Sequence, residues 1–150
     1  MPVVHIRKIL APVDFSDSSA GSLVYARVLA EKFGAELHLL HVIDDPAGYA
    51  RKAESWALLP DLRERLERET QGRLAALQPG DAVNEIRWGA PFLEILGYAR
   101  EHGIDLIVMG SHGHGAVMHL LLGSVADKVV HKAGCPVLTV RDPKHQYVNP

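Results

Sequence analysis

Three glycines and a serine in the C-terminal third of the chain have the types and the spacing needed to hold a phosphate group. Gly110 and Gly113 are separated by two residues, nine residues lie between Gly113 and Gly123, and Ser124 follows directly. Glycine lets the backbone come close to a ligand. Free N–H groups at a helix start, with the helix dipole behind them, attract anions. The stretch 110–125 is therefore our candidate phosphate-binding loop.

The spacing of these glycines excludes the two commonest phosphate loops. No Gly-Lys-Ser/Thr follows, as a P-loop requires, and the order is not G-x-G-x-x-G. The apolar, β-branched run 104–109 before the loop predicts a buried strand. After the loop, apolar residues recur on one side of a predicted helix that starts at Gly123-Ser124 and ends near Ala133. The loop thus lies between a strand and a helix.

The same alternation of strand and helix extends over the whole chain. Strands are predicted at 8–15, 36–43, 83–88, 104–109 and 137–140, with residues 3–6 as an extension of the first. Helices are predicted from Ser16–Ser19 to Gly34, from Asp61 to Pro79, from Phe92 to His102, and after the glycine loop. This order indicates a Rossmann-like α/β fold, with a parallel sheet covered by helices on both faces.

We expect one domain over residues 1–150, with 141–150 as a loose tail. Residues 44–58 are hard to interpret, although a segment near Arg51 to Leu58 could be helical. On the helix after Asp61, Glu64 with Arg68 and Glu69 with Arg73 are expected to form i,i+4 pairs.

Composition excludes several classes of partner. The chain has 150 residues, is 47% hydrophobic and 23% charged, and carries a formal net charge of −2. This charge gives no basic field for nucleic acid or anionic lipid. The first residues lack the long apolar core and cleavage site of a signal peptide, and no apolar run approaches the length needed to span a bilayer, so we expect neither feature. Cys135 is the only cysteine, so a reducing cytoplasm is the simplest location. We expect a cytoplasmic protein with no nucleic acid or membrane partner.

In open parallel sheets, ligands bind beyond the carboxyl ends of the strands, where the strand order reverses. Pro12-Val13-Asp14 follows the first predicted strand, and Met109-Gly110 ends the fourth. If those strands are neighbours, Asp14 and the glycine loop flank one crevice. Two structural alternatives stay open. Asp14 could cap the turn that follows it, and Ser124 with Asp127 resembles a capping box.

Motifs along the chain resemble those of the universal stress protein family. They are I-L-A-P-V-D-F-S at the first strand, L-H-V-I at the second, G-x-P after the third, D-L-I-V-M-G-S-H-G and L-L-G-S-V-A-x-K-V around the loop, and P-V-L-T-V-R at the end. The likeness covers nearly all of residues 5–141. The glycine spacing resembles the ATP-binding motif of this family, G-x2-G-x9-G-[S/T]. The resemblance implies an open five-stranded parallel sheet of order 3-2-1-4-5.

The resemblance also implies an adenine-nucleotide site. Pro12, Val13 and Asp14 would line the adenine side, and Val42 would touch the base or its edge. Met109 and Gly110 would face the ribose. The phosphates would be held by Gly113, Gly123, Ser124 and Val125 through backbone N–H groups and the Ser124 hydroxyl, and the predicted contacts also include Ser111 and His112. The implied ligand is ATP, together with Mg²⁺ that Asp14 could help to hold.

The roles of His112, His114 and His119, in or near the loop, stay open. A metal site needs converging ligands, and no Cys, Asp or Glu lies nearby, so we expect no metal site from the protein alone. A phosphate-facing role for one of these histidines is the better prediction. Relatives form homodimers through the last strand, so the resemblance implies a dimer through Val137, Leu138, Thr139 and Val140.

The sequence therefore predicts a cytoplasmic, ATP-binding or other adenine-nucleotide-binding stress-response protein that acts as a regulator or sensor. Cyclic AMP, AMP or ADP could occupy the same crevice. One alternative is a slow ATP hydrolase, for which only His112 or His114 could serve as a base, so we leave the question of enzymatic activity open. The other alternative is a dimeric interaction module that needs no nucleotide.

Overall fold

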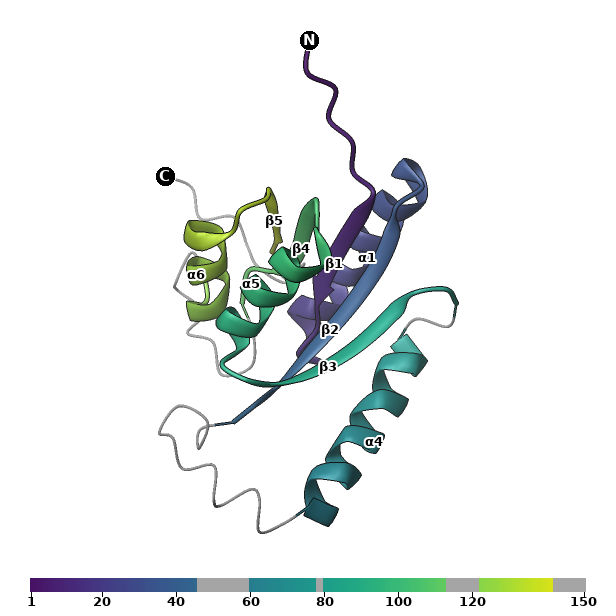
Figure 1. The fold of residues 1–150 in the computed structure, drawn as a ribbon, viewed down its shortest axis with the longest axis vertical. Helices are drawn as coiled ribbons and strands as arrows, with labels where there is room; N and C mark the ends of the chain where they lie inside the picture. The colour runs from purple at the N-terminus through teal and green to yellow at the C-terminus, as the bar shows by residue number, and fades with distance from the viewer. Residues whose placement is uncertain (46–59, 78–79, 113–121, 142–150) are drawn as a thin grey trace.

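The computed structural model of this chain describes residues 1–45, 60–77, 80–112 and 122–141. In chain order the elements are β1 (Lys8–Pro12), α1 (Asp17–Phe33), β2 (Glu36–Asp44), α4 (Pro60–Leu77), β3 (Val83–Gly89), α5 (Pro91–His102), β4 (Leu106–Gly110), α6 (Ser124–Lys132) and β5 (Val137–Val140). The five strands form one parallel sheet in the order β3-β2-β1-β4-β5 (Figure 1). The predicted fold class and strand order are confirmed.

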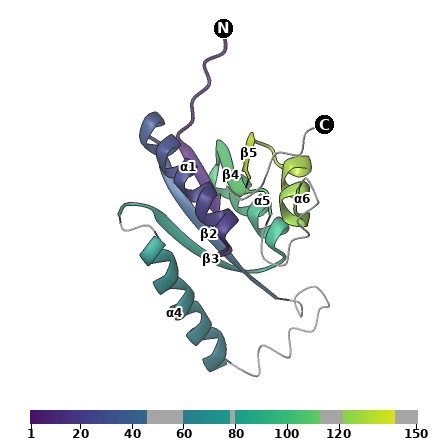
Figure 2. The same ribbon diagram turned by 180° about the vertical axis from the view of Figure 1, so that it is seen from behind.

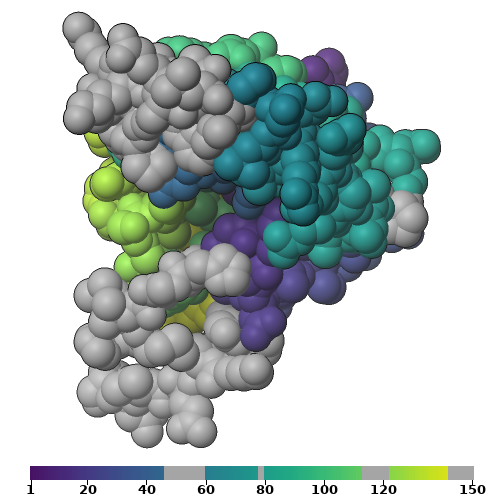
Figure 3. Space-filling view, turned by 90° about the horizontal axis from the view of Figure 1, so that it is seen from below, coloured from purple at the N-terminus to yellow at the C-terminus, as the bar shows by residue number. Residues whose placement is uncertain are grey.

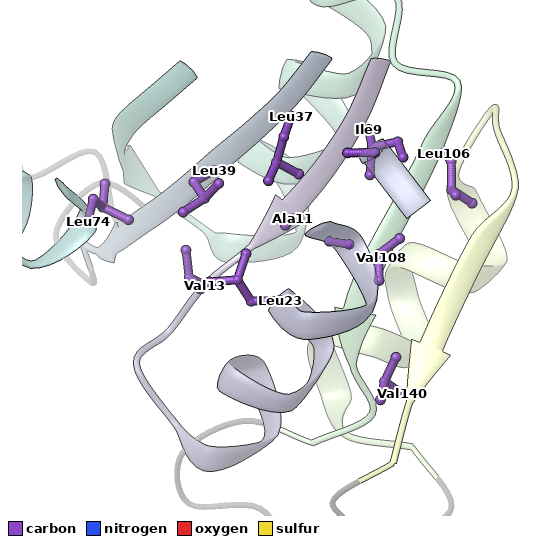
Figure 4. Close-up of a cluster of buried hydrophobic side chains, with 12 residues drawn as sticks. Ile9, Ala11, Val13, Leu23, Leu37, Leu39, Leu74, Leu106, Val108 and Val140 are labelled. Atoms are coloured by element: carbon purple, nitrogen blue, oxygen red, sulfur yellow. The ribbon is translucent and has the colours of Figure 1, made fainter. Parts of the chain in front are cut away.

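Helices cover both faces of the sheet, as Figures 1 and 2 show from opposite sides. Alternate strand residues point to opposite faces, so Ile9 packs with α1 and α4 while Leu10 packs with α5 and α6. The cluster under α1 and α4 is drawn in Figure 4, where Leu23 and Leu74 reach the sheet from the two helices. Burial on both faces explains why the inner strands β1 and β4 are almost continuously apolar.

Both ends of α1 and the C-terminal end of α5 follow the predicted signals. Ser16 is the N-cap of α1, and its side chain accepts a hydrogen bond from the Ser19 N–H at 3.2 Å. Gly34 and Gly103 end α1 and α5 with φ of 60° and 61°, a conformation that glycine adopts without steric cost. Pro91 begins α5, where its missing N–H costs no helical bond.

The bounds of two strands were predicted wrongly. β1 ends at Pro12 rather than at residue 15, because the chain turns after Val13 toward α1, and residues 3–6 lie outside it. β4 begins at Leu106 rather than at residue 104. There the Asp105 carboxylate accepts the backbone N–H groups of Arg7 and Lys8 at 2.8 and 3.0 Å, so it fixes the start of β1 against β4.

Two side-chain predictions were also wrong. Glu69 pairs with Arg65 at 3.3 Å rather than with Arg73, whose guanidinium lies over the Phe15 ring instead. The predicted pair of Glu64 with Arg68 is present at 3.6 Å. The proposed capping box at Ser124 is absent, because Gly123 is the N-cap of α6 and no side chain caps it.

Some expectations lie outside the described residues, namely the helix near 51–58 and all of the tail beyond residue 141. Within the described part of the chain, no helix combines the length and the apolar character needed to cross a membrane.

Candidate functional site

A cavity of about 650 Å³ lies at the carboxyl ends of β1, β2 and β4, and the first turn of α6 also lines it. Figure 3 views the molecule from this end, with the purple N-terminal residues and yellow-green α6 around a hollow. β1 and β4 are neighbours in the sheet. This is the arrangement that the predicted crevice between Asp14 and the glycine loop required. Eleven predicted site residues line the cavity: Pro12, Val13, Asp14, Val42, Met109, Gly110, Ser111, His112, Gly123, Ser124 and Val125. Gly113 lies outside the described residues.

One wall of the cavity is the turn that follows β1. The Asp14 carboxylate accepts a hydrogen bond from the Ser16 backbone N–H at 2.9 Å and another from the Ser16 hydroxyl. The Asp14 N–H in turn donates to Ser19 Oγ at 3.4 Å. Val13 remains tied to β2, because its N–H donates to the Leu40 carbonyl at 2.8 Å. Asp14 therefore fills the turn-capping role and lines the cavity as well.

His41 in β2 holds this wall from behind. Its Nδ1 lies 2.7 Å from the Val13 carbonyl oxygen, and its ring centroid is 4.7 Å from that of Phe15. Burial lowers the pKa of His41, and the positive charge of Arg73 lowers it further, against the opposing effects of the Val13 hydrogen bond and of Asp14. The imidazole is therefore neutral at pH 7. Because the Val13 carbonyl can only accept, Nδ1 carries the proton, which leaves Nε2 as an acceptor.

The opposite wall joins the end of β4 to the start of α6. Ser111 is 1% exposed, and its N–H donates to the Val140 carbonyl at 2.9 Å. Its carbonyl accepts the Gly123 N–H at 2.6 Å, and its hydroxyl lies 3.0 Å from His112 Nδ1. The two ends of the glycine loop are thus bound to each other. The Gly123 N–H is already used in this contact.

The first turn of α6 supplies three further N–H groups. The first bond within this helix is from the Asp127 N–H to the Gly123 carbonyl, at 2.9 Å. The N–H groups of Ser124, Val125 and Ala126 precede it, so they have no acceptor within the helix. All three residues line the cavity. Orphan amides at the positive end of a helix dipole are suited to an anion.

Gly110 has a packing role that needs no ligand. A Cβ at this position would lie 2.3 Å from Ser18 Oγ and 2.9 Å from the Ser18 carbonyl carbon in α1. Such distances are far inside van der Waals contact, so any larger residue would force α1 away from β4. This close approach explains the glycine without reference to ribose.

Sequence reasoning missed part of the lining. The missed residues are Ser19, Leu40, His41, Ile43, Asp44, Pro91, Ile95 and Ala126. Four of them flank Val42 at the end of β2, so extending the Val42 prediction along that strand would have found them. Pro91 and Ile95 lie one turn apart at the start of α5, in the segment that follows the G-x-P motif. Leu40, Ile95 and Ala126, together with Met109, belong to a core cluster and give the cavity an apolar side.

Within the described ranges, no group of three or more His, Cys, Asp or Glu side chains is placed to hold a metal ion. His114 and His119 fall outside those ranges. Cys135 is half-buried and packs against the core under α5 and α6. Burial raises the pKa of its thiol, which disfavours the nucleophilic thiolate.

Comparison with known proteins assigns the family. A sequence profile described as the universal stress protein family matches residues 5–141. This chain belongs to the universal stress protein family. Universal stress protein MJ0531 of Methanocaldococcus jannaschii is 35% identical over 144 residues, which cover 93% of this chain and 85% of the relative. Universal stress protein YxiE of Bacillus subtilis is 34% identical, over 89% of this chain and 98% of the relative.

Solved structures of family members share the fold. Protein MJ0577 of M. jannaschii superposes with a TM-score of 0.79 at 32% identity, over 93% of this chain and 97% of that chain. A universal stress protein crystallised in complex with cAMP superposes with a TM-score of 0.63 at 27% identity, over 92% and 98% of the two chains. At least one similar family member thus binds an adenine nucleotide.

Proposed function

We propose that this universal stress protein binds an adenine nucleotide in the cavity at the ends of β1, β2 and β4. ATP, together with Mg²⁺, is the ligand we put first, and the bound form acts as a regulator or sensor of stress in the cytoplasm. The observation that carries the proposal is convergence. Residues from segments far apart in the sequence, around Asp14, Val42, Gly110 and Ser124, line one cavity.

The two sides of the cavity match the two parts of a nucleotide. The apolar side, with Leu40, Met109 and Ile95, suits the flat face of a base. The three orphan amides at the start of α6 suit phosphate oxygens. A volume of about 650 Å³ is within the range of small-molecule sites. The cAMP complex of a relative supports the adenine assignment.

The roles within the site are more specific than the family resemblance suggested. Because the Gly123 N–H donates to Ser111, we assign the phosphate contacts to the amides of Ser124 and Val125 and to the Ser124 hydroxyl. The Asp14 carboxylate, which also caps its own turn, is the protein group proposed to help hold Mg²⁺. When bound, the metal would offset the charge of the phosphates.

Ser124 offers a sharp test because it is the first residue of α6. Proline is tolerated at this position, and the preceding Gly123 already has the extended conformation that proline requires (φ −67°, ψ 162°). Ser124→Pro removes both the N–H and the hydroxyl, whereas the matched Ser124→Ala removes the hydroxyl alone. Calorimetric titrations with ATP and Mg²⁺, ATP alone, AMP and cAMP would measure the dissociation constants.

We expect wild-type protein to bind at least one of these nucleotides with a dissociation constant of about 1 μM, equivalent to about 8 kcal/mol. Each lost bond to a charged phosphate should weaken binding by roughly tenfold to a hundredfold. Ser124→Pro should therefore bind more weakly than Ser124→Ala. Absence of heat with every nucleotide would refute the proposal, and equal affinities of both variants and wild type would refute the assignment to α6. Release of phosphate from ATP would instead favour a slow hydrolase.

A further inference from the structure

Phe15 has an unusual backbone conformation beside the candidate site. Its φ is 63°, and it is the one non-glycine residue with a positive φ in the part of the chain that the structure describes. The left-handed region is unfavourable for a bulky L-residue, since its Cβ approaches the following carbonyl. Such a conformation persists only where the surrounding contacts over-determine it.

The contacts that hold Phe15 come from two separate elements. His41 of β2 lies on one side, with 4.7 Å between the ring centroids. Arg73 of α4 lies over the ring, with its Cζ 3.8 Å from the ring centroid. The Phe15 side chain also packs against the core under α1 and α4. We call this arrangement of His41, Phe15 and Arg73 the Phe15 clamp.

The clamp is continuous with the wall of the cavity. Phe15 directly follows Asp14, and the next residue, Ser16, donates to the Asp14 carboxylate at 2.9 Å. The same His41 ring that contacts Phe15 also bonds to the Val13 carbonyl at 2.7 Å. Movement of the Phe15 ring would therefore displace Val13 and Asp14, which both line the cavity. Phe15 itself does not line it.

We propose that Phe15 is a positioning residue that, held between His41 and Arg73, fixes the Val13–Asp14 wall in the conformation that receives the ligand. Arg73 belongs to α4, and α4 contributes no described residue to the cavity. Through Arg73, α4 nevertheless supports the site. The ligand part of the inference rests on the nucleotide-binding function proposed above.

The test uses four variants of the full chain. Phe15→Gly removes the ring and relieves the strain, whereas Phe15→Tyr keeps the ring and is the conservative rescue. Arg73→Met removes the guanidinium but keeps an apolar stem. Arg65→Met, on an exposed part of α4, is its matched control because it removes the same charge from the same helix. Circular dichroism would establish that each variant is fully folded at the temperature of measurement.

The first readout is hydrogen exchange of the Val13 and Ser16 amides without ligand, since these two amides are bonded across the wall. We expect exchange to be roughly tenfold faster in Phe15→Gly and at least about threefold faster in Arg73→Met, the change expected from loss of a cation–π contact. Phe15→Tyr and Arg65→Met should exchange as wild type does. Unchanged exchange in both Phe15→Gly and Arg73→Met would overturn the proposal.

The second readout is nucleotide affinity, which a change in global stability alone does not alter in a fully folded protein. We expect dissociation constants to rise by about three- to tenfold in Phe15→Gly and Arg73→Met, and to stay at the wild-type value in the other two variants. Faster exchange with unchanged affinity would overturn the positioning role. If wild-type protein bound no nucleotide, the proposed function would fail, and the exchange measurement would still decide whether the clamp holds the wall.

Discussion

His41 shows how one side chain can hold the wall of the candidate site through its protonation state. The neutral ring donates through Nδ1 to the Val13 carbonyl and contacts the Phe15 ring in a tilted arrangement. Burial is the main cause of its lowered pKa, and Arg73 adds to the effect. The unfolded chain thus takes up a proton at higher pH than the folded protein does.

This difference predicts a pH dependence of stability. Above the ordinary histidine pKa of about 6.5 the ring is neutral in both states, and the full stability is present. As pH falls below that value the unfolded state binds more protons, so the free energy of unfolding should decrease until the folded-state pKa of His41 is passed. His41→Gln keeps a donor for Val13 and should remove part of this decrease.

Urea denaturation between about pH 7 and pH 5 would measure the effect, with His5→Gln in the exposed N-terminal segment as the control. NMR titration of the His41 ring would give the folded-state pKa directly. A His41 pKa at or above the ordinary value would contradict the prediction.

At the level of elements, the site depends on how closely α1 approaches the end of β4. A Cβ atom at position 110 would collide with Ser18 of α1. That approach brings Ser19 and the Asp14 turn to the same cavity as Gly110 and Ser111. Packing of α1 against β4 therefore determines the distance between the two walls.

Gly110→Ala should accordingly destabilise the protein by about 1–3 kcal/mol, the usual cost of overpacking, because the backbone of α1 must move. Gly72→Ala is the matched control. Gly72 lies within α4 with open space around its Cα, so alanine there should stabilise by about 0.5–1 kcal/mol.

Chemical denaturation would compare the two variants with wild type. The double variant Gly110→Ala, Ser18→Ala should recover part of the loss, since it removes the nearest clashing atom, Ser18 Oγ. Equal stability of Gly110→Ala and Gly72→Ala would show that α1 can move without cost.

For the whole molecule, β5 is the outer strand of the described sheet and offers an edge for pairing. β5 pairs only with β4 among the described strands, and Leu138 on it is 38% exposed. The Pro136 carbonyl accepts the N–H of Ile107 in β4, and the Val140 carbonyl accepts the N–H of Ser111, which directly follows β4. By the alternation of a parallel ladder, the N–H and carbonyl of Thr139 therefore face outward. Such an edge can pair with a second copy of the chain.

We predict a homodimer through Val137–Val140 that Thr139→Pro dissociates. Proline removes the outward N–H of this edge strand while leaving the β4 contacts in place. Thr139→Val keeps the N–H and should remain dimeric. Analytical ultracentrifugation over a concentration series would measure the dimer dissociation constant, which should rise at least about tenfold in Thr139→Pro, equivalent to about 1.4 kcal/mol. A Thr139→Pro protein that stays fully dimeric would show that the edge is not the interface.

Much of the fold could be predicted because its signals are local. Short β-branched apolar runs such as 106–109 favour buried strands, and Ser16 and Gly34 mark the ends of a helix through their own backbone chemistry. Alternation of these elements then leaves few topologies. One error came where a distant residue intervened, because Arg73 packs on Phe15 rather than pairing with Glu69.

The sequence by itself predicted a set of candidate nucleotide-binding residues, because glycine spacing and strand ends are features of the chain. Only the tertiary structure decided how those residues are used. It showed that the Gly123 N–H is occupied by Ser111, that Gly110 is required by Ser18, and that His41 and Arg73 hold Phe15 behind Asp14. Each of these facts is a contact between residues far apart in sequence. Such contacts depend on distances between packed elements, which no local pattern encodes.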